Sequence, residues 1–367
     1  MGESAMRKTI SRSVPMNSRK FGSLYIALAV SLCLLGCGGD VSPVSPASPV
    51  LGQEIAVATT TSAGTYTVPS GFYVSATWTV EPGTTFIMEP GSWIDVTAGG
   101  RIIARGTSDK PITFTSSKPV KAKGDWFGVD DAGNGSVYEY CSFEYAATGL
   151  GLSGSLAEVS HCRFEGNTDG LDSSRAASMG AFGSNAFVGN TEPLTVNGAF
   201  DVDDSNSFAS NTNQRARFAG HSVDRALSLS LVKVPVFVDN YIRVYATMAL
   251  SPGVVVSMAP EGWISVEASG RLTAIGTSAA PVRFVSSKPV PAPGDWFGIE
   301  VAGNASEFRY CEIGYADCGI EIFAECASLA LENSRIHHNT VGVDDKTAAL
   351  VTDAGTNTYE DNGTDRQ

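Results

Sequence analysis

The chain has 367 residues, with 25 basic and 38 acidic side chains and a formal net charge of −13 at pH 7. This acidic balance argues against a nucleic-acid-binding protein and against electrostatic docking on anionic lipid. The length allows one elongated domain or two compact ones, with enough residues for a large apolar core.

The N-terminal segment has the composition of an export signal. Five basic residues precede an apolar run, residues 24–35, that is too short to span a bilayer with ordinary flanks. The run ends in the sequence LLGC at residues 34–37, which resembles the lipobox of bacterial lipoproteins. The resemblance implies cleavage before Cys37 and lipidation of its thiol. Residues 1–37 are therefore predicted to be a lipoprotein signal peptide, and an ordinary secretion signal with a chance cysteine is the alternative.

A tether is predicted between this anchor and the rest of the chain. Residues 38–54 contain three Ser-Pro pairs, which favour an extended backbone. Gly38 follows Cys37 in place of the aspartate that retains enterobacterial lipoproteins in the inner membrane, so we expect an exported protein, lipid-anchored at the outer membrane or cell surface of a Gram-negative bacterium. Without residues 1–37 the chain has 20 basic and 37 acidic residues, a net charge of −17.

The remaining chain contains a tandem duplication of about 170 residues. The sequence SSKPV occurs at residues 116–120 and 286–290, at an offset of 170, and GDWFG recurs at the same offset. After a two-residue insertion the offset becomes 172. The predicted parts are a first copy, a unique middle and a second copy: residues 55–198, 199–225 and 226–367.

Each copy shows the pattern of short β-strands. Segments of three to five residues alternate apolar and polar side chains, with Gly, Asn, Asp, Ser and Pro between them. Residues 140–143 are echoed 21 positions later by residues 161–164, the kind of period that stacked rungs require. About fourteen rungs, roughly 4.8 Å apart, are expected.

The order of motifs within a copy is specific. GxLxAxGT, PIxF, GDWxGI, a Tyr-Cys line and an NxxGI corner follow one another, which is similar to the secreted right-handed parallel β-helix proteins of bacteria. The resemblance implies an all-β fold, a right-handed parallel β-helix (solenoid), over about residues 65–367. It leaves the chemistry open, because that fold carries enzymes, adhesins and inert stalks.

One set of residues suggests catalysis. Asn167-Thr168-Asp169, an Asp-Asp pair and a Gly-His dipeptide follow in the order found in polygalacturonases, which they resemble. This implies an alternative function, a polysaccharide hydrolase or lyase, with four candidate catalytic residues: Asp169, Asp203, Asp204 and His221. Two observations argue against it, since Val341 replaces Asp169 in the second copy and no Arg-x-Lys follows His221.

Asparagines recur at the corners of both copies. Asn167, Asn190, Asn339 and Asn362 are interpreted as side chains whose amides pair with the backbone at successive bends.

Two tryptophans are candidates for carbohydrate contact. Trp126 and Trp296, in the GDWFG loops, could present their rings to a sugar, or bury them over the edge of the coil, which the flanking glycines favour. Asp125 and Asp295 are expected to cap the same turns.

The cysteines suggest one disulfide. Cys318 and Cys326 occur only in the second copy and are the expected pair. Cys141 and Cys162 hold equivalent places in neighbouring rungs and either stack as buried thiols or bridge. No Cys/His spacing fits zinc, so neither a zinc site nor a cofactor is expected, and calcium at Asp130-Asp131 and Asp344-Asp345 is an alternative.

The sequence thus predicts a membrane-anchored cell-surface lipoprotein. Its β-helix is expected to be a structural or binding module for carbohydrate or adhesion, without catalytic residues. The expected partners are the membrane, through the lipid, and a polysaccharide or another surface protein, with no nucleic acid.

Overall fold

The computed structural model describes residues 51–52, 54–326, 328–347, 351–353 and 355–367. Internal contacts divide the chain into residues 1–47 and 48–367, and every described residue belongs to the second unit. Cys37, the predicted signal peptide and most of the predicted tether lie outside the described residues. In the described part, the regular elements are strands, β1 to β40, and no helix is long and apolar enough to cross a membrane.

The strands belong to five sheets, named S1 to S5, and hydrogen-bond in parallel to the strands of the neighbouring turns. S1 contains β1 (Thr59–Thr61), β4 (Thr77–Val80), β7 (Arg101–Arg105), β10 (Val137–Glu139), β13 (Ala157–Ser160) and β16 (Met179–Gly183). S2 contains β2 (Thr65–Val68), β5 (Thr85–Met88), β8 (Ile112–Ser116), β11 (Cys141–Glu144), β14 (Arg163–Glu165), β17 (Ala186–Val188) and β20 (Ser207–Ala209).

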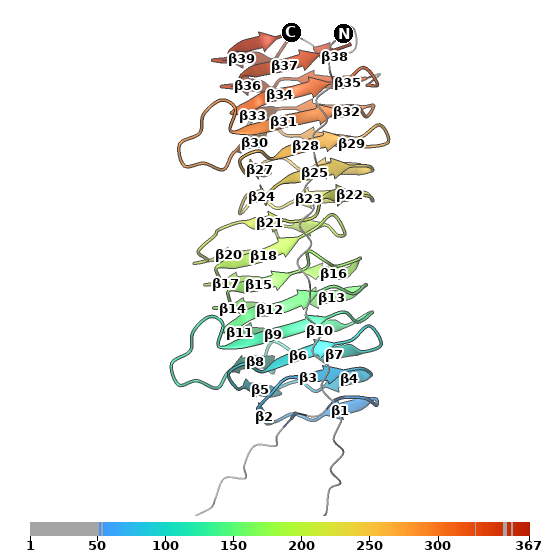
Figure 1. The fold of residues 1–367 in the computed structure, drawn as a ribbon, viewed down its shortest axis with the longest axis vertical. Coiled ribbons are helices and arrows are strands. Elements are labelled where there is room, and N and C mark those ends of the chain that lie inside the picture. Colours follow the sequence, from blue (N-terminus) through green and yellow to red (C-terminus); the bar gives the residue numbers. More distant parts are fainter. Residues whose placement is uncertain (1–50, 53, 327, 348–350, 354) are drawn as a thin grey trace, which may run out of the picture. The chain divides into compact units, whose positions relative to one another are not determined.

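S3 has 13 strands and is the one sheet that continues through both copies in the described part (Figure 1). It contains β3 (Phe72–Val74), β6 (Trp93–Val96), β9 (Trp126–Asp131), β12 (Ala146–Leu152), β15 (Asp169–Asp172), β18 (Glu192–Val196), β21 (Ala216–Phe218), β24 (Val236–Val238), β27 (Val255–Met258), β30 (Val282–Ser286), β33 (Cys311–Gly314), β36 (Arg335–His337) and β39 (Thr358–Glu360).

S4 and S5 belong to the later half of the chain. S4 contains β19 (Val202–Asp203), β23 (Leu227–Ser230), β26 (Thr247–Leu250), β29 (Arg271–Ile275), β32 (Ser306–Arg309), β35 (Leu329–Glu332) and β38 (Val351–Asp353). S5 contains β22 (Ser222–Val223), β25 (Tyr241–Val244), β28 (Trp263–Val266), β31 (Trp296–Val301), β34 (Ala316–Ile322), β37 (Val341–Asp345) and β40 (Thr364–Arg366). The predicted all-β parallel solenoid is therefore confirmed, with 13 stacked strands in S3 close to the fourteen rungs expected.

Inward-facing side chains repeat at the same place in successive turns. Five phenylalanines form one stack, with neighbouring ring centroids 4.9 to 5.3 Å apart: Phe86, Phe114, Phe143, Phe164 and Phe187. All of them are fully buried. The 21-residue echo predicted from the sequence is the register of this stack, because Phe143 pairs with Phe164.

Buried asparagines hold the corners of the coil. The Oδ1 atom of Asn167 accepts from the backbone N–H of Ala146 at 2.8 Å, and its Nδ2 donates to the carbonyl of Phe143 at 2.9 Å. The backbone N–H of Asn167 in turn donates to Oδ1 of Asn190 at 2.9 Å. Asn339 and Asn362 repeat these contacts in the second copy, so the corner interpretation is confirmed.

The two copies do not contribute equivalent strands to S3. Strand β9 of the first copy lies in S3, whereas its counterpart β31 lies in S5; β8 lies in S2, whereas its counterpart β30 lies in S3. The change occurs where β22 starts S5 and β24 pairs with β21 rather than with β20. The unique middle of the sequence therefore coincides with a shift of one sheet. In Figure 1 the equivalent long loops, residues 117–125 and 287–295, still project on the same side.

Candidate functional site

A groove lies on the outer face of S3 in the first copy. It has a volume of about 470 Å³ and is lined by residues of β6, β9, β12 and β15, together with Arg175, which follows β15. The outward positions of these four strands form two columns, because parallel pairing places residues of successive turns side by side. We call this feature the first-copy groove.

Two glycines lie at its centre, and one of them, Gly151, leaves space there. Gly128 stands between Trp93 and Thr148 in one column, and Gly151 stands between Asp130 and Asp172 in the other. Gly128 has φ +132°, and a Cβ there would lie 1.8 Å from the carbonyl oxygen of Thr148, so no side chain fits. A Cβ at Gly151 would meet Oδ1 of Asp130 at 3.3 Å, which a small shift of that carboxylate relieves.

Aromatic rings border the groove. Phe127 is 62% exposed, and its backbone N–H donates to the carbonyl of Ser92 at 2.9 Å. The ring of Trp93 lies against Gly71, where a Cβ would come within 1.8 Å of the indole, and it meets Tyr73 edge-on at 4.8 Å. Because Gly71 lacks a side chain, the Trp93 ring can occupy this position over the sheet.

Three carboxylates line the same groove: Asp95, Asp130 and Asp172. Arg175 Nη2 lies 3.3 Å from Oδ1 of Asp130, and no ion pair joins Asp95 or Asp172 to a cation among the described residues. Burial, followed by the negative charges of Asp130 and Asp131, raises the pKa of Asp95. The groove thus combines aromatic surface with an excess of negative charge.

The equivalent surface of the second copy lies on S5 and is filled. Glu321 stands in the position of Gly151, between Glu300 and Asp344, and it forms an ion pair with Lys346. Tyr241 replaces Gly71 and stacks on Trp263, with ring centroids 4.6 Å apart and planes 20° apart. The duplication has therefore kept the strands and the tryptophan while removing the hollow.

The predicted carbohydrate contacts at Trp126 and Trp296 are wrong. Both rings are buried, and their indole N–H groups donate to the carbonyls of Glu144 at 2.8 Å and Gly314 at 3.0 Å. Each tryptophan is thus part of the core, and the neighbouring phenylalanine carries the exposed ring. Phe297, the counterpart of Phe127, is 43% exposed.

The capping role predicted for Asp125 and Asp295 is confirmed. Asp125 accepts from the Ser116 hydroxyl at 2.7 Å and from the backbone N–H of Ala122 at 2.9 Å, and it pairs with Lys118 at 2.8 Å. The bonds from Lys118, Ala122 and Ser116 outweigh burial and lower the pKa of Asp125. Asp295 is held in the same way, so these carboxylates order the two long loops.

The four candidate catalytic residues do not meet in one site. Asp169 lies in β15 of S3, Asp203 ends β19 of S4 with Asp204 directly after it, and His221 precedes β22 of S5. Asp203 accepts from the backbone N–H of Ser205 at 3.0 Å. Asp204 accepts a hydrogen bond from the backbone N–H of Val232 at 2.8 Å. The ring of His221 stacks on that of Tyr241, with ring centroids 4.6 Å apart. The polygalacturonase-like assignment fails because the intervals between these residues place them on different sheets.

Asp169 nevertheless borders the first-copy groove. It pairs with Thr148, one position from the groove's centre, and both Asp169 and Asp172 are partly exposed although two residues lie between them. The intervening Gly170 and Leu171 are both buried, so regular alternation is interrupted here. Burial and the charges of Asp172 and Glu192 raise the pKa of Asp169.

The expected Cys318–Cys326 disulfide is not formed, and all five cysteines of the described part are free thiols. Cys318 occupies the column that also holds Gly298 and Val341 on S5. Cys326 lies beyond the strand, fully buried, with Sγ donating to the carbonyl of Gly303 at 3.4 Å. The two side chains thus belong to different environments. No group of three or more potential metal ligands occurs among the residues that the structure describes.

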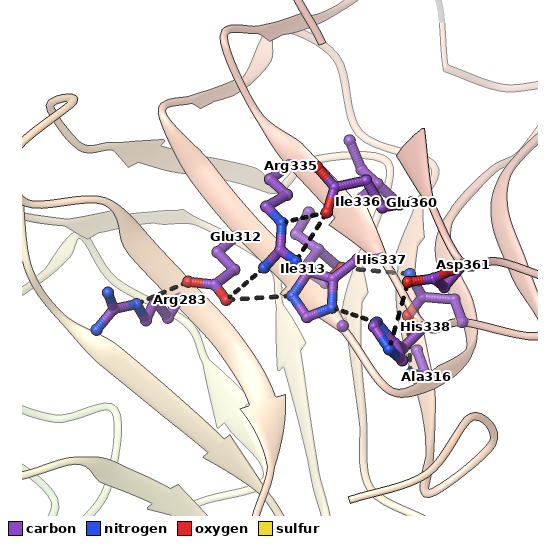
Figure 2. Close-up of polar contacts among 12 residues, drawn as sticks. Arg283, Glu312, Ile313, Ala316, Arg335, Ile336, His337, His338, Glu360 and Asp361 are labelled. Atoms are coloured by element: carbon purple, nitrogen blue, oxygen red, sulfur yellow. Dashed lines mark hydrogen bonds and ion pairs between the residues drawn. The ribbon is translucent and has the colours of Figure 1, made fainter. Parts of the chain in front are cut away.

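A second polar cluster lies on S3 of the second copy. Figure 2 shows Glu312 between Arg283, Arg335 and His337. Arg283 Nε donates to Oε2 at 2.8 Å, while Arg335 Nη1 and His337 Nε2 lie 3.2 and 3.1 Å from Oε1. The hydrogen bond from His337, followed by the contacts with Arg283, lowers the pKa of Glu312 to about 2. The cluster joins strands β30, β33 and β36, so its evident role is to hold neighbouring turns together.

The comparisons with known proteins concern the first copy. The comparison with curated proteins and that with solved structures found no match. Residues 53–176 match the family model described as a pectate-lyase like beta helix domain. The matched residues include the whole first-copy groove, from Trp93 to Arg175. The chain is thus a parallel β-solenoid, and its residues 53–176 are similar to the pectate-lyase-like β-helix domain.

Proposed function

We propose that the protein is an exported, lipid-anchored surface protein whose solenoid is a non-catalytic carbohydrate-binding module. The observation that supports this function is the first-copy groove, where Trp93 and Phe127 border a hollow that Gly151 leaves open. Aromatic rings suit the apolar faces of sugars, and the carboxylates can accept hydrogen bonds from hydroxyl groups. A volume of about 470 Å³ is sufficient for a small number of sugar units.

The non-catalytic assignment rests on the arrangement of the acids. The residues that resemble the polygalacturonase set are spread over three sheets. Asp130, in the groove, is already paired with Arg175. A ligand that lies along S3 would therefore be held by rings and hydrogen bonds without a preassembled set of catalytic groups.

A glycan array with purified protein tests the binding function. Trp93→Ala and Phe127→Ala should each weaken binding about tenfold or more, because each removes an aromatic ring that lines the groove. Phe297→Ala, which removes the equivalent ring of the filled surface, is the matched control and should leave binding unchanged. Equal losses from Phe127→Ala and Phe297→Ala would contradict the assignment to the first-copy groove. Release of reducing or unsaturated ends that Asp95→Asn abolishes would make the protein an enzyme.

The proposed anchor is tested separately. Cys37→Ser should release the protein from the membrane fraction, since the diacylglycerol on this thiol and the acyl chain on the new N-terminus supply the attachment. Labelling with a fatty-acid probe should be lost in the same variant. Continued membrane association without label would remove the lipid anchor from the proposal while leaving the groove untouched.

A further inference from the structure

The first-copy groove carries an excess of negative charge that its own cations do not neutralise. Of the three acids that line it, Asp130 faces Arg175, whereas Asp95 and Asp172 have no paired cation in the described chain. The next residue inward, Asp131, is buried and accepts a 2.7 Å hydrogen bond from the hydroxyl of Tyr138. A ligand in the groove therefore meets a surface with several unneutralised carboxylates.

These carboxylates are placed along the groove, not gathered at one point. Asp95, Asp130 and Asp172 lie on β6, β9 and β15 in one column, and Gly151 of β12 separates the last two. Adjacent turns are about 4.8 Å apart, so Asp130 and Asp172 are separated by roughly 10 Å. No cluster of three or more His, Cys, Asp or Glu side chains that could hold a metal ion occurs among the described residues. Several separated positive charges on a chain-like ligand would match this spacing better than one metal ion.

We infer, building on the proposed carbohydrate function, that the first-copy groove selects glycans with free amino groups. The ammonium groups of such a glycan would pair with Asp95 and Asp172, and Trp93 and Phe127 would contact its ring faces. Pectate, the substrate named in the matched family description, is a polyanion and would be repelled by the same carboxylates. The groove thus lies on a fold similar to that of the matched family, but its carboxylates favour a positively charged glycan over a negatively charged one.

The test compares two oligomers with the same backbone, β-1,4-linked glucosamine and β-1,4-linked N-acetylglucosamine, by calorimetric titration of the full-length protein. At low salt and a pH where the amines are protonated, the glucosamine oligomer should bind roughly tenfold more tightly. Each of Asp95→Asn and Asp172→Asn should reduce this preference about threefold, because each removes one partly exposed ion pair. High salt should reduce it in the same way.

Matched variants separate charge from shape. Gly151→Gln fills the hollow without adding charge and should remove binding of both oligomers. Glu300→Gln and Asp344→Asn, which neutralise the carboxylates of S5 that correspond to Asp130 and Asp172, should leave the preference as it is.

Equal affinity for the two oligomers, or tighter binding of oligogalacturonate, would overturn the charge selectivity while the carbohydrate function stands. Absence of binding to every glycan of the panel would overturn both.

Discussion

The first-copy groove and the equivalent surface of the second copy have the same strands but different contents. Gly151 leaves one surface open and Gly71 makes room for the Trp93 ring, whereas Glu321 and Tyr241 occupy the equivalent positions of the other. Both surfaces keep a buried tryptophan, an exposed phenylalanine and a glycine of positive φ in the GDWFG segment. The segment shared by the copies therefore builds the solenoid, and the residues that differ are the ones on which the proposed ligand binding depends.

The largest effect should come from the shared part of this comparison. Trp126→Ala and Trp296→Ala each remove a buried ring and its indole hydrogen bond, so each should lower the free energy of unfolding by about 3 to 5 kcal/mol. Chemical denaturation monitored by circular dichroism measures this. Phe127→Ala and Phe297→Ala, which truncate exposed rings, are the controls and should change stability far less. A small effect at either tryptophan would contradict its role in the core.

Acid should lower the stability of the second copy more than that of the first, because of Glu312. The pKa of Glu312 is about 2 in the folded protein, against 4.5 for the ordinary side chain. Its contribution to the free energy of unfolding is therefore present above about pH 4.5. The contribution is lost as the pH falls from that value towards 2. Because about a quarter of the side chain is exposed, we expect about 1 to 2 kcal/mol, less than the full shift implies.

Glu312→Gln should remove this pH dependence, and hydrogen exchange in β33 and β36 at pH 5 and pH 3 localises it. Ser142 occupies the equivalent position of the first copy, so β11 and β14 should show no such change. Equal acid sensitivity in wild type and variant would show that another group is responsible.

The hollow itself should be transferable. Tyr241→Gly together with Glu321→Gly recreates both open positions on S5, so Trp263 can leave its stack and a second site can form. The number of glycans bound per chain should rise from one to two. Each single variant is a control. Tyr241→Gly alone leaves the Glu321 side chain in place, and Glu321→Gly alone leaves Trp263 stacked on Tyr241. An unchanged stoichiometry would show that further residues define the groove.

Much of the fold could be predicted from the sequence because the duplication repeats its strand and corner residues. The Asn167 and Asn190 corners and the Phe143–Phe164 stack recur with the period of a turn, so the pattern itself gave their neighbours. The shift of one sheet between the copies was not predictable, because β8 and β30 look alike while they belong to different sheets. It depends on a single pairing, β24 with β21.

The groove escapes sequence reasoning for two physical reasons. Its carboxylates come from separate turns, and the exposed ring of the GDWFG segment is that of Phe127, on a strand whose alternation Gly128, with φ +132°, interrupts. Phe127 and Asp130 are consequently both exposed, although two residues lie between them. The sequence contained one indication of the groove: Glu321 replaces Gly151 at the equivalent position of the second copy.

The smallest effect on stability should come from the cations that distinguish the two surfaces. Arg175 and Lys346 are both substantially exposed and pair with Asp130 and Glu321, so Arg175→Gln and Lys346→Gln should each change the free energy of unfolding by less than about 1 kcal/mol.

The effects of Arg175→Gln and Lys346→Gln on glycan binding should differ. Loss of Arg175 removes the only cation among the residues that line the first-copy groove, which should strengthen binding of an amino-bearing glycan. Loss of Lys346 leaves the Glu321 side chain at the position equivalent to Gly151, so the surface of S5 should still bind no glycan. Weaker glycan binding after Arg175→Gln would mean that this guanidinium contacts the ligand, and the contrast between the two surfaces would then depend on a positive charge as well as on space.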